Sequence, residues 1–212
     1  MKKYTKQQKQ LITHVINKVK ILFTNFPIPA HGIDHIERVV KWATIIAEKE
    51  KAKNPFLCEL SAWLHDIGHT LSLKPKEKRS HHELSYILLK QWFQEDREFD
   101  FLNDAEKIEL LYAVRYHYND QAIKYDTAWI LRDADKLDGF GEIGMKRANE
   151  YFKDDKKGFN DNLRFMFSNL LFLKTKTAHK IVSEKNLMVP VYNEHEKILK
   201  ARIEEINLNK LR

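Results

Sequence analysis

The sequence predicts an all-α fold, and three observations support this. Apolar residues recur at helical spacing through most of the chain. The chain has only 6 glycines and 5 prolines, too few for the many tight turns of an all-β fold. Its 212 residues suffice for one well-packed core and argue against a second. We therefore expect one helical domain.

The first three helices are marked by periodic apolar residues and by turn signals. A helix is expected over 8–23, and two prolines and a glycine in the following NFPIPAHG segment prevent its continuation. A second helix is expected over 34–51. A third begins near Asn54, which caps it with Pro55 at the first helical position, and ends around Gly68.

The rest of the chain follows the same pattern. The segment TLSLKPKEKRS is expected to be a charged loop, and further helices are expected over 81–94, 104–118, 126–152 and 160–174. A long helical segment completes the chain. Since no repeat or shift in composition marks a linker, we predict a single domain over 1–212, with a motif-bearing core at about 30–150 and a C-terminal segment at about 158–212.

Composition and charge restrict the location and partners of the protein. No apolar run approaches the roughly 18 residues of a membrane span, and the single cysteine, Cys58, fits a reducing compartment, so we expect a cytoplasmic protein without membrane association. The net charge of +7 favours anionic ligands. Because the lysines are spread along the chain, nucleic acid is not the expected partner. No oligomeric state is predicted.

Several ionisable residues share a face with apolar residues of their own helices. His35 precedes Val39, Trp42 and Ile46 by four, seven and eleven positions, which places it on the stripe that faces the core. Comparable spacings apply to His65, Asp66, His82, His117 and Asp135. Asp133 competes with Asp135, because apolar residues also precede it at helical spacing.

A shared divalent metal would explain this inward set. Burying so many ionisable groups separately would cost several kcal/mol each unless they were paired or bound a cation. A cation favours both ionised carboxylates and neutral imidazoles, and mixed nitrogen and oxygen ligands suit Mn, Fe, Co, Ni or Zn. His65 and Asp66 are adjacent, about 100° apart on a helix, so both can flank one ion.

Five motifs carry a resemblance to a known family. In order along the chain they are HGIDHIERV, WLHDIGH, HHELS, YAVRYH and RDADKLDGFGEIG, spanning about 30–150. Together they resemble the HD-domain superfamily of metal-dependent phosphohydrolases, most closely its small stand-alone bacterial branch. The resemblance implies an all-α bundle with a central metal site, which agrees with the helical pattern.

The resemblance also implies a ligand set. His35, His65, Asp66 and Asp135 match the four ligands that define the family, and the AD-x-L context favours Asp135 over Asp133. In dinuclear members two further histidines hold a second ion and the aspartate of the HD pair bridges. His82 and His117 lie in the matching order, either as ligands or as hydrogen-bonding neighbours, and Asp138 is a candidate supporting residue. One or two ions are expected, of Mn, Fe, Co, Ni, Mg or Zn.

The expected reaction is hydrolysis of a phosphate monoester, diester or nucleotide by metal-activated water. Asp66 would orient or deprotonate that water, and His69 would contact phosphate or protonate the leaving oxygen. Candidate phosphate contacts follow from proximity in sequence, with a surface charge as the alternative for each: Arg38, Arg79, His81 and Lys136. The expected partner is a small phosphorylated molecule, with a nucleotide as the first choice.

The sequence also departs from familiar subclasses. Gly68, His69 and Thr70 stand where long alarmone hydrolases carry an acidic pair, and the glycine-tyrosine-proline signature of one phosphodiesterase class is absent. Gly32 follows His31 where near relatives often have aspartate, which leaves the role of His31 open. Two alternative functions remain: a di-iron oxygenase of the same fold and a non-catalytic nucleotide-binding or regulatory module.

Overall fold

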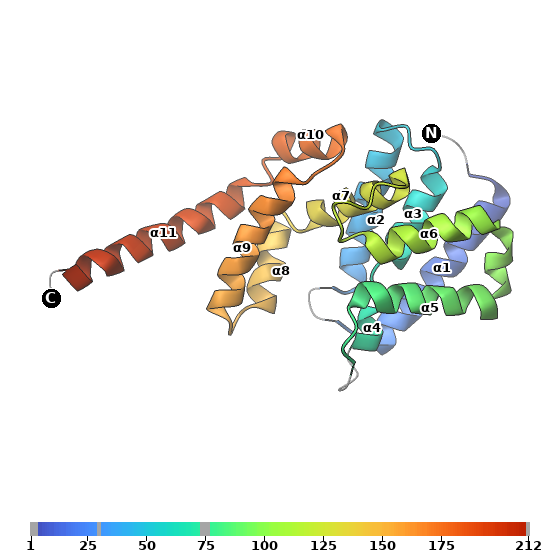
Figure 1. Cartoon of the computed structure of the whole chain (residues 1–212), viewed down its shortest axis with the longest axis horizontal. Coiled ribbons are helices and arrows are strands. Elements are labelled where there is room, and N and C mark those ends of the chain that lie inside the picture. Colours follow the sequence, from blue (N-terminus) through green and yellow to red (C-terminus); the bar gives the residue numbers. More distant parts are fainter. Residues whose placement is uncertain (1–3, 29–30, 73–76, 211–212) are drawn as a thin grey trace.

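The computed structural model describes residues 4–28, 31–72 and 77–210, with side chains to residue 207, and confirms the all-α fold (Figure 1). The elements are α1 Lys6–Asn25, α2 Ile33–Lys49, α3 Pro55–Leu64, α4 His69–Ser72, α5 His81–Glu95, the 3-10 helix η1 Arg97–Phe101, α6 Asp104–Tyr116, α7 Asp126–Asp138, α8 Gly141–Tyr151, α9 Lys156–Leu171, α10 Lys176–Glu184 and α11 Val189–Lys210. Residues 29–30 and 73–76, which fall in the expected break and charged loop, lie outside the described residues. No helix in the described part of the chain is both long and apolar enough to cross a membrane.

The expected continuous helix over 126–152 is wrong, because α7 and α8 are separated by a turn. Gly139 closes α7 by donating its backbone N–H to the carbonyls of Asp135 and Lys136. Gly141 follows with φ of 71°, a value that favours glycine. A Cβ on Gly144 would lie 2.0 Å from the Gly139 oxygen, so the close approach of α8 to this turn requires glycine at residue 144.

Smaller differences occur at other helix ends. α3 ends at Leu64 rather than at Gly68, and a turn over 65–68 leads directly into the short α4. The long helical segment expected after residue 174 consists of α10 and α11, which are separated near Asn186, where φ is 51°. The predicted cap of α3 is confirmed, since the Asn54 side chain accepts a hydrogen bond from the backbone N–H of Leu57.

The centre of the molecule is formed by α2, α3 and α7, which pack against one another (Figure 1). Nearly every residue of α3 is buried, including Phe56, Leu60 and Leu64. A helix that is apolar on all sides must be enclosed by other helices. The C-terminal end of α3 therefore lies in the interior of the molecule, and so do the residues that follow it.

The C-terminal helices gather at one end of the molecule. α8 packs against α7, α9 and α11, and α11 then extends away from the remaining helices (Figure 1). Val191, in the first turn of α11, is fully buried, whereas Leu199 and Ile203 farther along are about half exposed. Only the first part of α11 thus contributes to the core.

The turn after α3 lies directly against the N-terminus of α5. The backbone N–H of Gly68 donates to Ser85 Oγ at 2.8 Å. A Cβ at residue 68 would lie 2.2 Å from the carbonyl oxygen of His81 and 2.3 Å from the backbone nitrogen of Ser85. Since real contacts of this kind are never so short, only glycine permits this approach.

We predict that Gly68→Ala destabilises the protein by at least about 2 kcal/mol and lowers Tm by roughly 4–8 °C, because α5 must move away from the turn. Thermal unfolding followed by circular dichroism measures this. Gly32→Ala is the control: a Cβ there would lie 3.6 Å from the nearest atom, so the cost should stay below about 1 kcal/mol. Equal Tm values for the two variants would contradict the prediction.

Candidate metal centre

Asp66 lies at the centre of a cluster of histidines, with its side chain 4% exposed. On one side its Oδ2 atom is 3.4 Å from His35 Nε2, 3.5 Å from His65 Nε2 and 3.6 Å from His69 Nε2. These distances exceed those of good hydrogen bonds but match two ligand atoms held around one ion. The Oδ2 atom therefore faces a space enclosed by imidazole nitrogens.

The other oxygen of Asp66 faces a second set of histidines. Its Oδ1 atom is 3.6 Å from His81 Nε2 and 3.9 Å from His117 Nε2. His82 joins this set, since its ring centroid is 4.7 Å from that of His117. Each of His81, His82 and His117 presents a nitrogen within 4.8 Å of the others. A carboxylate between two such sets has the geometry of a bridging ligand.

Backbone carbonyls fix the orientation of two histidines. His65 Nδ1 donates to the carbonyl of Ala62 and His117 Nδ1 donates to that of Val114, each at 2.8 Å. Because a carbonyl only accepts, Nδ1 must carry the proton, and in the neutral ring Nε2 carries the lone pair. Both residues immediately follow a helix, so the last turn of α3 and of α6 aims each Nε2 atom at Asp66.

His35 is oriented by a carboxylate instead. Its Nδ1 lies 2.7 Å from Asp138 Oδ2, and Asp138 also accepts hydrogen bonds from Arg38 Nε and Arg147 Nη1, both at 2.5 Å. Burial alone would lower the pKa of His35, but the hydrogen bonds with Asp138 and Asp66 raise it to about 9. The two arginines and His35 hold the pKa of Asp138 at about 2, so Asp138 stays ionised. This arrangement is common behind metal-binding histidines.

Arg147 was missed by sequence reasoning. It lies on α8, within the stretch expected to continue α7, and a straight helix there would carry it away from Asp138. The glycines of the intervening turn were the available signal, since they end α7 and allow α8 to return.

The structure separates the two competing aspartates on α7. Asp135 Oδ1 lies 3.4 Å from His35 Nε2 and 4.0 Å from His65 Nε2, so it belongs to the histidine cluster. Asp133 is fully buried elsewhere and accepts hydrogen bonds from the backbone N–H groups of Lys174 and Thr175 at 2.7–3.0 Å. Asp133 thus anchors the segment before α10.

Burial keeps several of the histidines neutral. Desolvation lowers the pKa of His31 to about 4, that of His81 to about 2 and that of His82 to about 3. Burial alone would raise the pKa of Asp66, but His65 and His35 hold it well below its usual range. Neutral imidazoles around an ionised carboxylate are the protonation states in which these groups bind metals.

The predicted phosphate-binding cations are engaged in other interactions. Arg38 is bonded to Asp138, and Arg79, at the surface, pairs with Glu77. Lys136 is nearly buried, and its Nζ lies 2.5 Å from Asp120 Oδ1. Of the residues predicted to contact phosphate, His81 and His69 lie against Asp66.

The donor set fits a divalent metal. Three groups of residues that share no member each bring three ligand atoms within 4.8 Å of one another: His35, His65 and Asp135; His81, His82 and His117; His31, Asp66 and His69. The buried Nε2 atom of His69 has no hydrogen-bond partner among the described residues, which an ion would supply. Mixed imidazole and carboxylate ligands suit Mn, Fe, Co, Ni or Zn.

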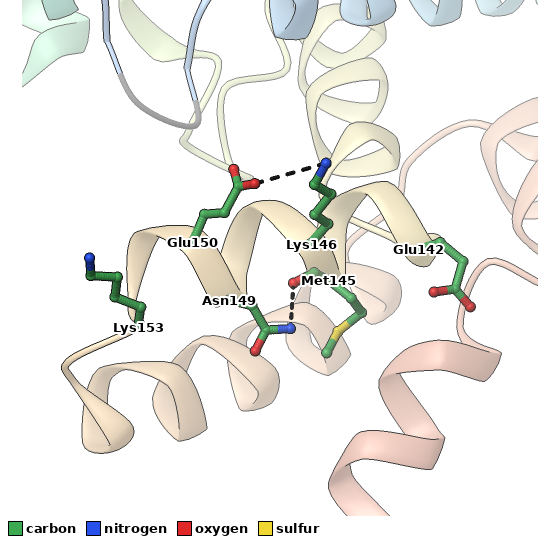
Figure 2. Close-up of a pocket in the computed structure, with 6 residues that line it drawn as sticks. All are labelled: Glu142, Met145, Lys146, Asn149, Glu150 and Lys153. Carbon is green, nitrogen blue, oxygen red and sulfur yellow. Dashed lines mark hydrogen bonds and ion pairs between the residues drawn. The ribbon is translucent and has the colours of Figure 1, made fainter.

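A separate hollow of about 510 Å³ lies along α8. Figure 2 shows its lining residues on one side of that helix, including Lys146, which pairs with Glu150, and Asn149, which donates to the carbonyl of Met145. None of the clustered histidines lines it. The hollow therefore offers no comparable chemistry, and the histidine cluster is the candidate site.

Replacing Asp133 should lower the stability of the protein, whereas replacing Asp135 should lower its affinity for metal. Asp133→Ala leaves buried backbone donors unpaired and should destabilise the protein by about 1–3 kcal/mol without changing metal affinity. Asp135→Ala should weaken metal binding by more than about tenfold with little effect on the stability of the metal-free protein. Chemical denaturation and metal titration measure the two effects. Loss of metal binding in Asp133→Ala, with binding retained in Asp135→Ala, would contradict this assignment.

Comparisons with known proteins agree with this geometry. The family model described as HD domain matches residues 32–139, about half of the chain. A comparison with curated proteins finds no match. Among solved structures, a predicted HD superfamily hydrolase from an uncultured Thermotogales bacterium is 23% identical, covering 91% of each chain with a TM-score of 0.61.

Two further structures share the fold. Bacillus subtilis YpgQ, solved in complex with ADP, is 19% identical, with 90% of this chain and 96% of that chain covered and a TM-score of 0.67. An HD-superfamily hydrolase from Bacillus thuringiensis is also 19% identical, with 94% and 98% covered and a TM-score of 0.64. HD domains are metal-dependent, and the cluster around Asp66 offers suitable ligands. With the family model matching half of its length, the chain belongs to the HD-domain family.

Proposed function

We propose that the protein is a metal-dependent phosphohydrolase that cleaves a phosphate monoester, a phosphate diester or a nucleotide with water as the nucleophile. The position of Asp66 is the main support, because a buried carboxylate faces imidazole nitrogens with both of its oxygens. Such a group can hold ions and still reach a water molecule beside them. The resemblance to HD-superfamily hydrolases supports the same reaction class.

The residues that would hold the metal come from five places in the fold. We assign His35 on α2, His65 and Asp66 after α3, and Asp135 on α7 to one ion, and His82 and His117 to a second, with Asp66 bridging. When bound, a divalent ion lowers the pKa of its water toward neutrality and offsets negative charge on the phosphoryl oxygens. Asp138 holds His35 in place for this purpose.

The chain's own proton chemistry centres on Asp66. Its low pKa keeps it ionised, so an oxygen of its carboxylate can orient the attacking water by accepting a hydrogen bond from it. His81 lies 3.6 Å from Asp66 with its side chain 27% exposed, so it can meet a phosphoryl oxygen at the edge of the cluster. The arginine Arg38, 29% exposed, would bind phosphate only in competition with Asp138.

We propose a nucleotide as the substrate class. YpgQ, which shares the fold, was solved with ADP, and the positive charge of this chain favours an anionic ligand. If the base and sugar of a nucleotide bind outside the cluster, its phosphates can reach the histidines.

The test is a panel of nucleotides and phosphomonoesters assayed for phosphate or pyrophosphate release with Mn, Co, Ni, Mg, Zn and Fe(II), with oxygen uptake recorded in parallel. We expect release that a chelator abolishes, and a loss of at least about 100-fold in Asp66→Ala. Asp161→Ala, an exposed aspartate on α9 paired with Arg164, is the matched control and should keep full activity.

Two results would replace this proposal. Oxygen uptake without phosphate release would identify an oxygenase that uses iron at the same cluster. Tight nucleotide binding without turnover, across all of the metals tested, would identify a regulatory module.

A further inference from the structure

We propose that His31 and His69 hold an additional divalent ion beside Asp66, distinct from the ions assigned to the other two groups of ligands. The inference rests on the metal centre of the proposed function but not on its hydrolytic reaction. It replaces the role in proton transfer or phosphate contact that the sequence suggests for His69.

The geometry of His31, Asp66 and His69 supports a third position. One ligand atom from each of the three residues lies within 4.8 Å of the other two, and His69 Nε2 is 3.6 Å from Asp66 Oδ2. The rings of His31 and His69 lie side by side, with centroids 4.6 Å apart and planes inclined by 33°. Two imidazoles and a carboxylate oxygen therefore converge on one space.

The ion would take no histidine from its neighbours and would share only Asp66 with them. The histidines assigned to the first ion are His35 and His65, and those assigned to the second are His82 and His117, so neither ion uses His31 or His69. Asp66 Oδ2 also faces His35 and His65, so this carboxylate would lie between adjacent ions and offset their mutual repulsion.

No contact among the described residues accounts for the buried Nε2 atom of His69. Its Nε2 atom is inaccessible to solvent and has no hydrogen-bond partner among the described residues, although its side chain as a whole is 16% exposed. Stacking on His81, with centroids 3.8 Å apart, holds the ring plane but satisfies neither nitrogen. An ion on Nε2 would satisfy it without moving the ring.

The position of this third group in the fold suggests an exchangeable ion. His31 lies two residues before α2 and His69 begins α4, so both side chains come from helix ends, and both are only partly buried. His65, in contrast, is fully buried. His31 also lies one residue before the stretch that the family model matches. The third ion would therefore be more accessible than the ion held by His65.

The test counts Mn²⁺ ions bound per chain after equilibrium dialysis, by elemental mass spectrometry of the protein and by electron paramagnetic resonance of the unbound ion. We expect three ions for the native chain, one for each group. His31→Gln should lower the number of bound ions by one. His31→Glu, whose side chain matches Gln in size but ends in a carboxylate ligand, should restore the native number. His69→Gln should also lose one ion.

Two controls keep the result specific. His195→Gln, on α11, removes a histidine outside the three groups and should bind as many ions as the native chain. Circular dichroism of each variant verifies the fold, and structural damage would affect the Gln and Glu variants alike. His31→Gln combined with Asp135→Asn should lose two ions, because the two residues belong to different groups.

The inference is overturned if His31→Gln and His69→Gln bind as many ions as the native chain, or if the loss in His31→Gln is not reversed by His31→Glu. Intact phosphate release in that case would leave the proposed function standing. A native chain that bound no Mn²⁺, Co²⁺ or Zn²⁺ at all would overturn both.

Discussion

The burial of a single carboxylate governs the rest of this structure. Asp66 follows a helix that is enclosed on all sides, so its charge lies where solvent cannot stabilise it. Histidines from several segments surround it, and two of them, His65 and His117, are aimed by carbonyls one turn earlier in the chain. Neither the carboxylate nor the imidazoles would be stable at this depth alone. The same desolvation that makes the arrangement costly would favour a bound cation.

Charged residues around the histidine cluster hold its ligands in place. Asp138 accepts from His35, Arg38 and Arg147, and this links α2, α7 and α8 around one carboxylate. Arg132, on α7, contacts the segment that follows α6. Its guanidinium donates to the carbonyl of Asn119 and lies close to Asp120. Of the cations that the sequence suggested for substrate binding, Arg38 is thus engaged in supporting the site, whereas Arg79 pairs with Glu77 at the surface.

Sequence reasoning predicted the elements and residues that depend on local pattern. The helices and the inward faces of His35, His65 and Asp66 follow from spacing, because apolar stripes report which side of a helix is buried. Spacing failed to distinguish Asp133 from Asp135, since apolar residues precede both at helical spacing and only tertiary contacts separate them. It also missed the turn at Gly139, where helix-forming residues on both sides concealed a requirement for close backbone packing. The position of His31 beside His69 depends on the chain's return after α3, which no local pattern reports.

The ligands come from segments separated by about a hundred residues, from His31 to Asp135. An unfolded chain cannot hold them together, so any ion that binds here binds almost only to the native state. By mass action, an ion at one hundred times its dissociation constant adds about 2.7 kcal/mol to the free energy of unfolding. That is a large fraction of the stability of an ordinary domain. The availability of the metal in the cell would then set the lifetime of this protein as well as its chemistry.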